Sequence, residues 1–165
     1  FFFFIMFNNV HAHVGELEAV AISVEQQVKS INSQNAWKAY SPKNKLGIEF
    51  FYDSKNVPSP YAGLKIATTR TRYNDSSFLI KLKKSRKLHH QVMGADSKKL
   101  NYKNIAYTIQ TFQIDCNQKK IMKMEVIADF DNNHRLLNLL PSMRRQFSSI
   151  RANTSNDNLY KILCK

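Results

Sequence analysis

Two cysteines and one dense basic run are the residues of this chain whose types and spacing could support chemistry. Cys116 ends a segment of strand-like alternation, and Cys164 lies one residue before the C-terminus. In an oxidising compartment this pair would form a disulfide, closing a loop of about 49 residues worth roughly 4 kcal/mol in the chain-entropy model. In a reducing compartment the two residues would stay free, buried thiols. Taken alone, the cysteines leave both states open.

The basic run lies between residues 81 and 90 and predicts an anion-binding site. Its five cationic side chains precede His89 and His90, and Lys98 and Lys99 would extend it. Heparin-like glycans, lipopolysaccharide and nucleic acids are the anions that such runs attract. The alternative interpretation is solvated charge at a strand end and in the loop after it. The predicted site residues are Lys81, Lys83, Lys84, Arg86 and Lys87.

Other sites of chemistry are missing from the sequence. It contains no glycine-rich phosphate loop, no Gly-x-Ser-x-Gly elbow and no metal-hydrolase His-Glu pair. The histidines at 11, 13, 89, 90 and 134 show no metal-ligand spacing. We therefore predict no catalytic residues, no metal site and no cofactor, and we expect a protein that is not an enzyme.

Length and charge restrict the class of protein further. The chain has 165 residues, which is one domain by length, and its 43% hydrophobic content is that of a globular fold. The net charge is +13. This charge favours anionic partners, among them nucleic acid, a lipid or lipopolysaccharide surface, sulfated glycans and acidic proteins.

The first residues resemble the end of a secretory signal peptide. An apolar run, Phe1 to Phe7, is followed by small residues at Val10 and Ala12, which suit cleavage before His13. Because the chain opens with Phe, we expect the basic start of the signal to lie upstream. A buried N-terminal strand is the alternative. No later segment has the length of a membrane span.

The periodicity of apolar residues predicts the helices and strands that carry the cysteines and the basic run. Helical spacing of apolar residues predicts an amphipathic helix over 15–32, which could pack on the domain, pair with a second copy or act as a spacer. Period-two alternation predicts strands near 48–53, 64–72, 78–82, 105–116 and 122–130. The change of phase near Thr111 predicts a bulge there or a twist between two packed surfaces. Residues 83–101 read as a loop or weak helix. A capping box at 154–157 starts a short helix that carries Cys164. The expected core is Phe50, Tyr52, Ile66, Ile80, Ile109, Met122, Met124, Val126 and Phe130.

Four stretches, taken together, resemble the surface-adhesin protein E family of Gram-negative bacteria. Trp37 precedes the aromatic-Asp segment 50–54, where the family has a Tyr-Tyr-Ile-Asp-Ser element. The strand 107–116 ends in a cysteine, an aromatic-Asp pair stands at 130–131, and residues 153–164 match a terminal helix with the second cysteine. The resemblance covers about residues 37–165.

The resemblance implies both a fold and a function. The implied fold is α+β: an antiparallel sheet of about six strands with a C-terminal helix packed on it and disulfide-linked to it, here with an N-terminal helix added. The implied disulfide joins Cys116 to Cys164. The implied function is adhesion to host extracellular-matrix or serum proteins such as vitronectin, laminin and plasminogen, and in some members haem binding.

We therefore expect three segments: a signal remnant at 1–12, a helix and linker at 13–35, and an adhesin-like domain at 36–165. The expected location is the periplasm, the cell surface or the medium. Expected partners are host matrix proteins or anionic glycans, an anionic envelope surface, and a second copy of the chain. Two alternatives are a structural periplasmic envelope protein and, less favoured, a basic cytosolic nucleic-acid-binding protein.

Overall fold

The computed structural model describes residues 14–92, 104–141 and 146–165. The proposed signal peptide, with His11 and His13, and the extension at Lys98 and Lys99 lie outside these ranges. Helices and strands follow along the described residues as α1 Val14–Ser33, β1 Trp37–Ser41, β2 Glu49–Asp53, β3 Leu64–Arg72, α2 Ser76–Val92, β4 Tyr107–Asp115, β5 Lys120–Phe130, β6 Leu136–Pro141, β7 Ser148–Ser149 and α3 Ser155–Leu163.

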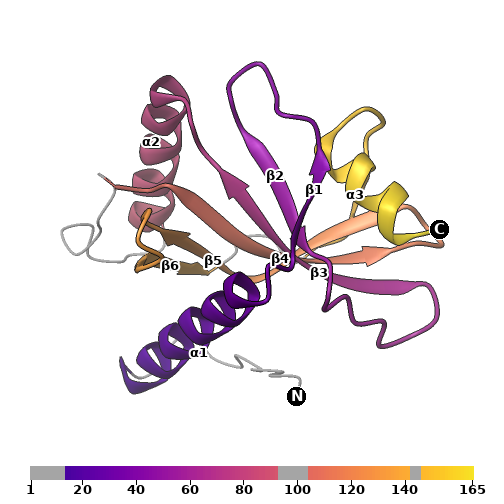
Figure 1. Cartoon of the computed structure of the whole chain (residues 1–165), viewed down its shortest axis with the longest axis horizontal. Coiled ribbons are helices and arrows are strands. Elements are labelled where there is room, and N and C mark those ends of the chain that lie inside the picture. Colours follow the sequence, from indigo (N-terminus) through magenta and orange to yellow (C-terminus); the bar gives the residue numbers. More distant parts are fainter. Residues whose placement is uncertain (1–13, 93–103, 142–145) are drawn as a thin grey trace.

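The strands form one antiparallel sheet in which β1 to β6 lie side by side in chain order (Figure 1). The two-residue strand β7 pairs with β5 beside this path. The register of β4 against β5 shifts between Gln110 and Phe112, so the predicted irregularity near Thr111 is present, with the extra residues of the bulge on the paired strand β5. The α+β class, with about six main strands and helices at both ends of the chain, is confirmed.

Two strands form where the alternation predicted none. β1 begins at Trp37, and β6 occupies the leucine-rich stretch that ends at Pro141. Pro141 is the last residue of β6, at the edge of the main strand path. A missing N–H is tolerated on an edge strand, so the proline ends β6 without preventing it.

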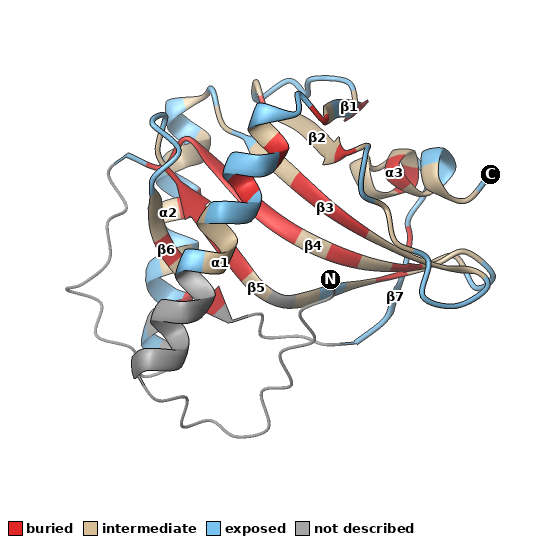
Figure 2. Cartoon of the chain, turned by 60° about the horizontal axis from the view of Figure 1, so that its bottom comes forward, coloured by how far each residue is buried: buried red, intermediate tan, exposed pale blue. Residues whose placement is uncertain are grey.

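Helix α1 packs on one face of the sheet, which confirms the predicted helix and the simplest of its three uses (Figure 2). Its Val28 lies in a buried cluster with Tyr107, Ile109 and Phe130. The indole Nε1 of Trp37 donates a hydrogen bond of 2.8 Å to the side-chain oxygen of Asn32 in the last turn of α1. The helix is therefore part of the domain rather than a free spacer.

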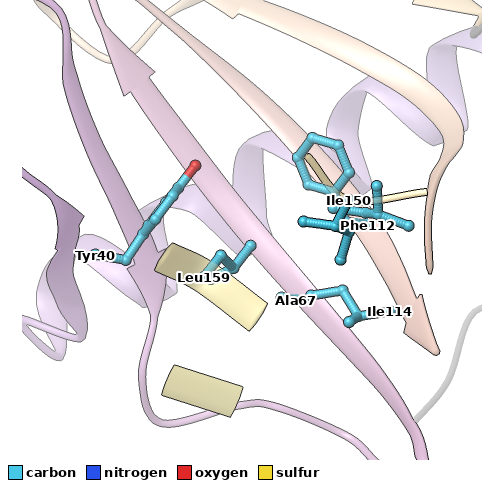
Figure 3. Packing of buried hydrophobic residues seen from close by; sticks show 7 residues of the cluster. Tyr40, Ala67, Phe112, Ile114, Ile150 and Leu159 are labelled. Atoms are coloured by element: carbon cyan, nitrogen blue, oxygen red, sulfur yellow. The ribbon is translucent and has the colours of Figure 1, made fainter. Parts of the chain in front are cut away.

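Helix α3 covers part of the opposite face, over a second core cluster (Figure 3). Successive strand residues point to opposite faces, so Phe112 and Ile114 of β4 face α3 whereas Tyr107 and Ile109 face α1. Leu159 of α3 packs on these residues and on Ala67 of β3.

Helices on both faces change which residues form the core. Ile109 and Phe130 are buried as predicted, but Phe50, Tyr52, Ile66, Met122, Met124 and Val126 are only half-buried. On β5 the phase expected to face solvent is buried as well, because Ile127 and Asp129 are covered. The prediction from alternation assumes that one face of the sheet is exposed to solvent. Here helices pack on both faces, so residues of both phases are buried.

The disulfide between Cys116 and Cys164 joins the end of β4 to the end of α3. The two Cα atoms lie 5.4 Å apart, and the hydroxyl of Tyr160 donates a hydrogen bond of 3.1 Å to the carbonyl oxygen of Cys116. The pairing that the family resemblance implied is thus present, and it holds the C-terminal helix to the sheet.

The start of α3 is held by a buried carboxylate. Thr154 accepts a hydrogen bond from the backbone N–H of Asp157, which is one half of the predicted capping box, and the Asp157 carboxylate accepts its return bond from the backbone N–H of Asn153 at 3.1 Å. The Asp157 side chain is 1% exposed and forms ion pairs with Lys161 (2.8 Å) and Lys119 (3.0 Å). Hydrogen bonds from Lys161, then Lys119, hold the pKa of Asp157 well below its usual value.

Acid is therefore expected to destabilise the protein through Asp157. Because its pKa is lower in the folded than in the unfolded chain, its contribution is complete above the unfolded pKa of about 3.9 and declines as the pH falls below it. Melting curves should show the wild type losing stability between about pH 4 and pH 2 more steeply than Asp157→Asn, which has no carboxylate to protonate. Parallel pH profiles would contradict this role.

Candidate anion-binding face of helix α2

The predicted basic run lies on helix α2, so of the two structures expected from residue 83 onward the helix is the one that forms, as far as residue 92. The expected strand at 78–82 is therefore wrong. Asp75 caps the helix, accepting hydrogen bonds from the hydroxyl of Ser77 and from the backbone N–H of Phe78. The apolar residues read as alternating also fit a helix, because Phe78 and Leu82 lie one turn apart on its sheet-facing side.

Arg86 points into the protein and clamps α2 to the sheet. Its guanidinium pairs with both carboxylate oxygens of Asp129 on β5, at 3.0 and 3.1 Å, and Asp129 is 0% exposed. The hydroxyl of Thr108 donates to the same carboxylate at 2.6 Å, and Tyr73 donates to Thr108 at 2.9 Å. Burial raises the pKa of Tyr73 to about 12, so it remains a neutral donor. Arg86 is thus used for folding.

The structure divides the five predicted anion-site residues into two groups. Lys81, Lys84 and Lys87 are exposed on the outer side of α2. Arg86 and the half-buried Lys83 make contacts within the protein. His89 is buried, so it does not extend the site outward. Because a helix has 3.6 residues per turn, basic residues that are adjacent in the sequence lie on different sides of α2.

The exposed side of α2 forms what we call the basic face: Ile80, Lys81, Lys84, Lys87, Leu88 and Gln91. These positions follow helical spacing, so they form one stripe opposite Leu82 and Arg86. Ile80, predicted for the core, is exposed here. No Asp or Glu occurs between residues 76 and 92, and the capping Asp75 is the acidic group at the start of the helix, where it interacts with Lys81.

A second cationic feature, missed by the sequence reading, lies on the other face of the sheet. The guanidinium of Arg70 lies 4.8 Å from the ring centre of Trp37, 4.7 Å from that of Phe51 and 5.8 Å from that of Tyr107. Its Nε is buried without a hydrogen-bond partner, and burial lowers the Arg70 pKa. Arg70 belongs to β3, and its guanidinium fills the space between aromatic side chains of β1, β2 and β4 on one face of the sheet, so these contacts hold the strands' side chains together. Pairing of distant strands creates the cluster, so no local signal marks it.

An open pocket of about 450 Å³ lies where α3 begins, beside β5 and β7. Ser148, Arg151 and Asn156 are among its lining residues, but hydroxyl, amide and guanidinium groups alone do not make a reaction centre. Across the described ranges, no three His, Cys, Asp or Glu side chains are placed to hold a metal ion. No helix in the same ranges is long and apolar enough to cross a membrane.

Comparisons by sequence found neither a matching family model nor a matching curated protein. Comparison of structures found protein E of Haemophilus influenzae in three crystal structures. Its crystal form II is matched with a TM-score of 0.50 at 9% identity, over 78% of this chain and 87% of that one. A further structure of protein E gives a TM-score of 0.49 at 10% identity, and the selenomethionine form gives 0.46 at 11%. Over about four fifths of its length, this chain has a fold similar to that of Haemophilus influenzae protein E.

Proposed function

We propose that this chain is an exported, non-enzymatic binding protein that engages polyanionic partners through the basic face of α2. The single observation that carries the proposal is the row of exposed lysines 81, 84 and 87 on a helix without any acidic residue. Partners of this chemistry include the anionic glycans of host matrix proteins, in keeping with the adhesin family that the sequence resembles.

Export is supported by the disulfide, because such bonds persist in the periplasm and outside cells and are rare in the cytosol. The same argument disfavours a cytosolic nucleic-acid-binding protein. The basic face also lacks aromatic side chains on which single-stranded bases could stack.

Binding to heparin tests the proposal. Replacing Lys81, Lys84 and Lys87 by Gln should reduce the slope of log affinity against log salt by about 2–3, because each lysine displaces roughly 0.7–0.9 counterions. The fold should survive, since substitutions at exposed positions change stability by about 0.5 kcal/mol or less. Elution from a heparin column and titrations at several salt concentrations would measure the change.

The matched control removes the same charge elsewhere, through Lys29, Lys38 and Lys45→Gln, all exposed and on α1, β1 and a loop. Lys161 is unsuitable as a control because it pairs with the buried Asp157. The α2 variant should elute at distinctly lower salt than the control variant. Equal shifts would mean that the net charge acts diffusely and that α2 holds no site.

A further inference from the structure

The basic face of α2 exposes two large apolar side chains that the binding of a soluble polyanion does not explain. Ile80 is 56% exposed and Leu88 is 61% exposed. Burying both on the sheet would have been favourable, yet the sequence places Lys83 and Arg86 toward the protein and these two outward. The two side chains stand among the exposed lysines on the same side of α2, so this side offers apolar and cationic groups together.

The spacing of the stripe gives it a defined shape. Ile80 and Leu88 are eight residues apart, which is roughly 12 Å along the axis at 1.5 Å per residue. The three exposed lysines lie at or between them, within one side of the helix. Helix α2 stands at an outer end of the molecule in Figure 1, well apart from α1 and α3. Because its residues are exposed, the basic face is the side of this helix that is turned away from the sheet.

We propose that the basic face docks on a lipid bilayer that carries anionic headgroups. Ile80 and Leu88 enter the boundary between headgroups and acyl chains, and Lys81, Lys84 and Lys87 contact the phosphates. The inference rests on the proposed function, since it uses the same lysines, and it deepens that function by naming the partner. A lipid interface accepts both kinds of side chain, because it is apolar below and anionic above.

A glycan chain fits the stripe less well than a bilayer does. Sulfates and carboxylates would pair with the lysines and leave Ile80 and Leu88 in water. A planar surface reaches all five side chains on this side of the helix at once, and lysine stems extend so that the ammonium groups stay at headgroup level. The clamp from Arg86 to Asp129 holds α2 in one orientation, so the stripe is presented without an ordering step.

Co-sedimentation with vesicles tests the proposal on the disulfide-bonded protein. Vesicles of phosphatidylcholine and phosphatidylglycerol in equal parts should bind the wild type, and pure phosphatidylcholine vesicles should not. Lys81, Lys84 and Lys87→Gln should lower the partition coefficient about a hundredfold, as expected for roughly a fivefold contribution per lysine. Ile80→Ser with Leu88→Ser should lower it by about tenfold or more, and Leu46→Ser with Tyr61→Ser, at exposed sites outside α2, should leave it unchanged.

Heparin binding separates this inference from the proposed function. The variant Ile80→Ser with Leu88→Ser should keep the heparin elution of the wild type, because it retains every lysine. Retained heparin binding without binding to the anionic vesicles would overturn the lipid proposal and leave the proposed function standing. Vesicle binding that is unaffected by the Ser substitutions would also overturn it, because charge alone would then explain the affinity. If the variant with Lys81, Lys84 and Lys87→Gln bound heparin and anionic vesicles as the wild type does, both the proposed function and the lipid proposal would be overturned.

Discussion

Replacing Arg86 by methionine is expected to lower the free energy of unfolding by about 3–5 kcal/mol, the usual effect of removing one partner from a buried ion pair. The substitution leaves the Asp129 carboxylate at 0% exposure with the Thr108 hydroxyl but without its cation. An unpaired buried charge has lost its hydration without compensation. Urea denaturation followed by the fluorescence of the single tryptophan, Trp37, would measure the loss.

An exposed lysine of the same helix, Lys84, supplies the control. Lys84→Met removes the same charge from an exposed site and should change stability by about 0.5 kcal/mol or less. The double variant Arg86→Met with Asp129→Leu should recover most of the stability, because it removes both charges together. A single Arg86→Met variant as stable as Lys84→Met would show that the clamp does not hold α2.

Removal of the disulfide, by Cys116→Ser with Cys164→Ser, should have the other large effect. The bond spans 48 residues, and for a loop of that size the chain-entropy model gives a stabilisation of about 4 kcal/mol. Helix α3 should still dock in the variant, since Leu159 and the ion pairs of Asp157 remain. Denaturation midpoints of the variant and the wild type would give the difference.

Reduction of the wild type provides an independent check on the same bond. The reduced wild type and the double Ser variant should unfold at the same denaturant concentration, because both have lost only the cross-link. Equal stability of the oxidised and reduced wild type would contradict the predicted contribution. A protein stabilised in this way suits an oxidising compartment, where the bond persists.

The arginine clamp also changes how the predicted anion site can be tested. A substitution of all five predicted residues would remove Arg86 with the lysines, and lost binding could then reflect a displaced helix. Restricting the change to Lys81, Lys84 and Lys87 keeps the fold and the clamp. The structure thereby defines a smaller site that can be tested without unfolding the protein.

Features that depend on residues close together in the chain could be predicted from the sequence. The helix at 15–32 shows the 3.6-residue period, the cap at 154–157 uses hydrogen bonds between residues close in the chain, and the phase change near Thr111 coincides with a bulge on the paired strand β5. Each feature depends on contacts between residues close in the chain, or on the exposure pattern of one element. The cysteine pairing needed more, because the residues alone made it depend on an oxidising compartment, and the signal-like start and the family resemblance were needed to favour it.

The remaining features were decided by tertiary structure. Phe78, Ile80 and Leu82 satisfy the period of a strand, but Phe78 and Leu82 without Ile80 also satisfy that of a helix, and packing of α2 on the sheet selected the helix. That choice turned Arg86 toward Asp129, left Ile80 in solvent and reduced five candidate cations to three. The same assembly brought Arg70 among Trp37, Phe51 and Tyr107. A sequence pattern describes one element at a time, whereas burial and ion pairing depend on what lies across the interface between elements.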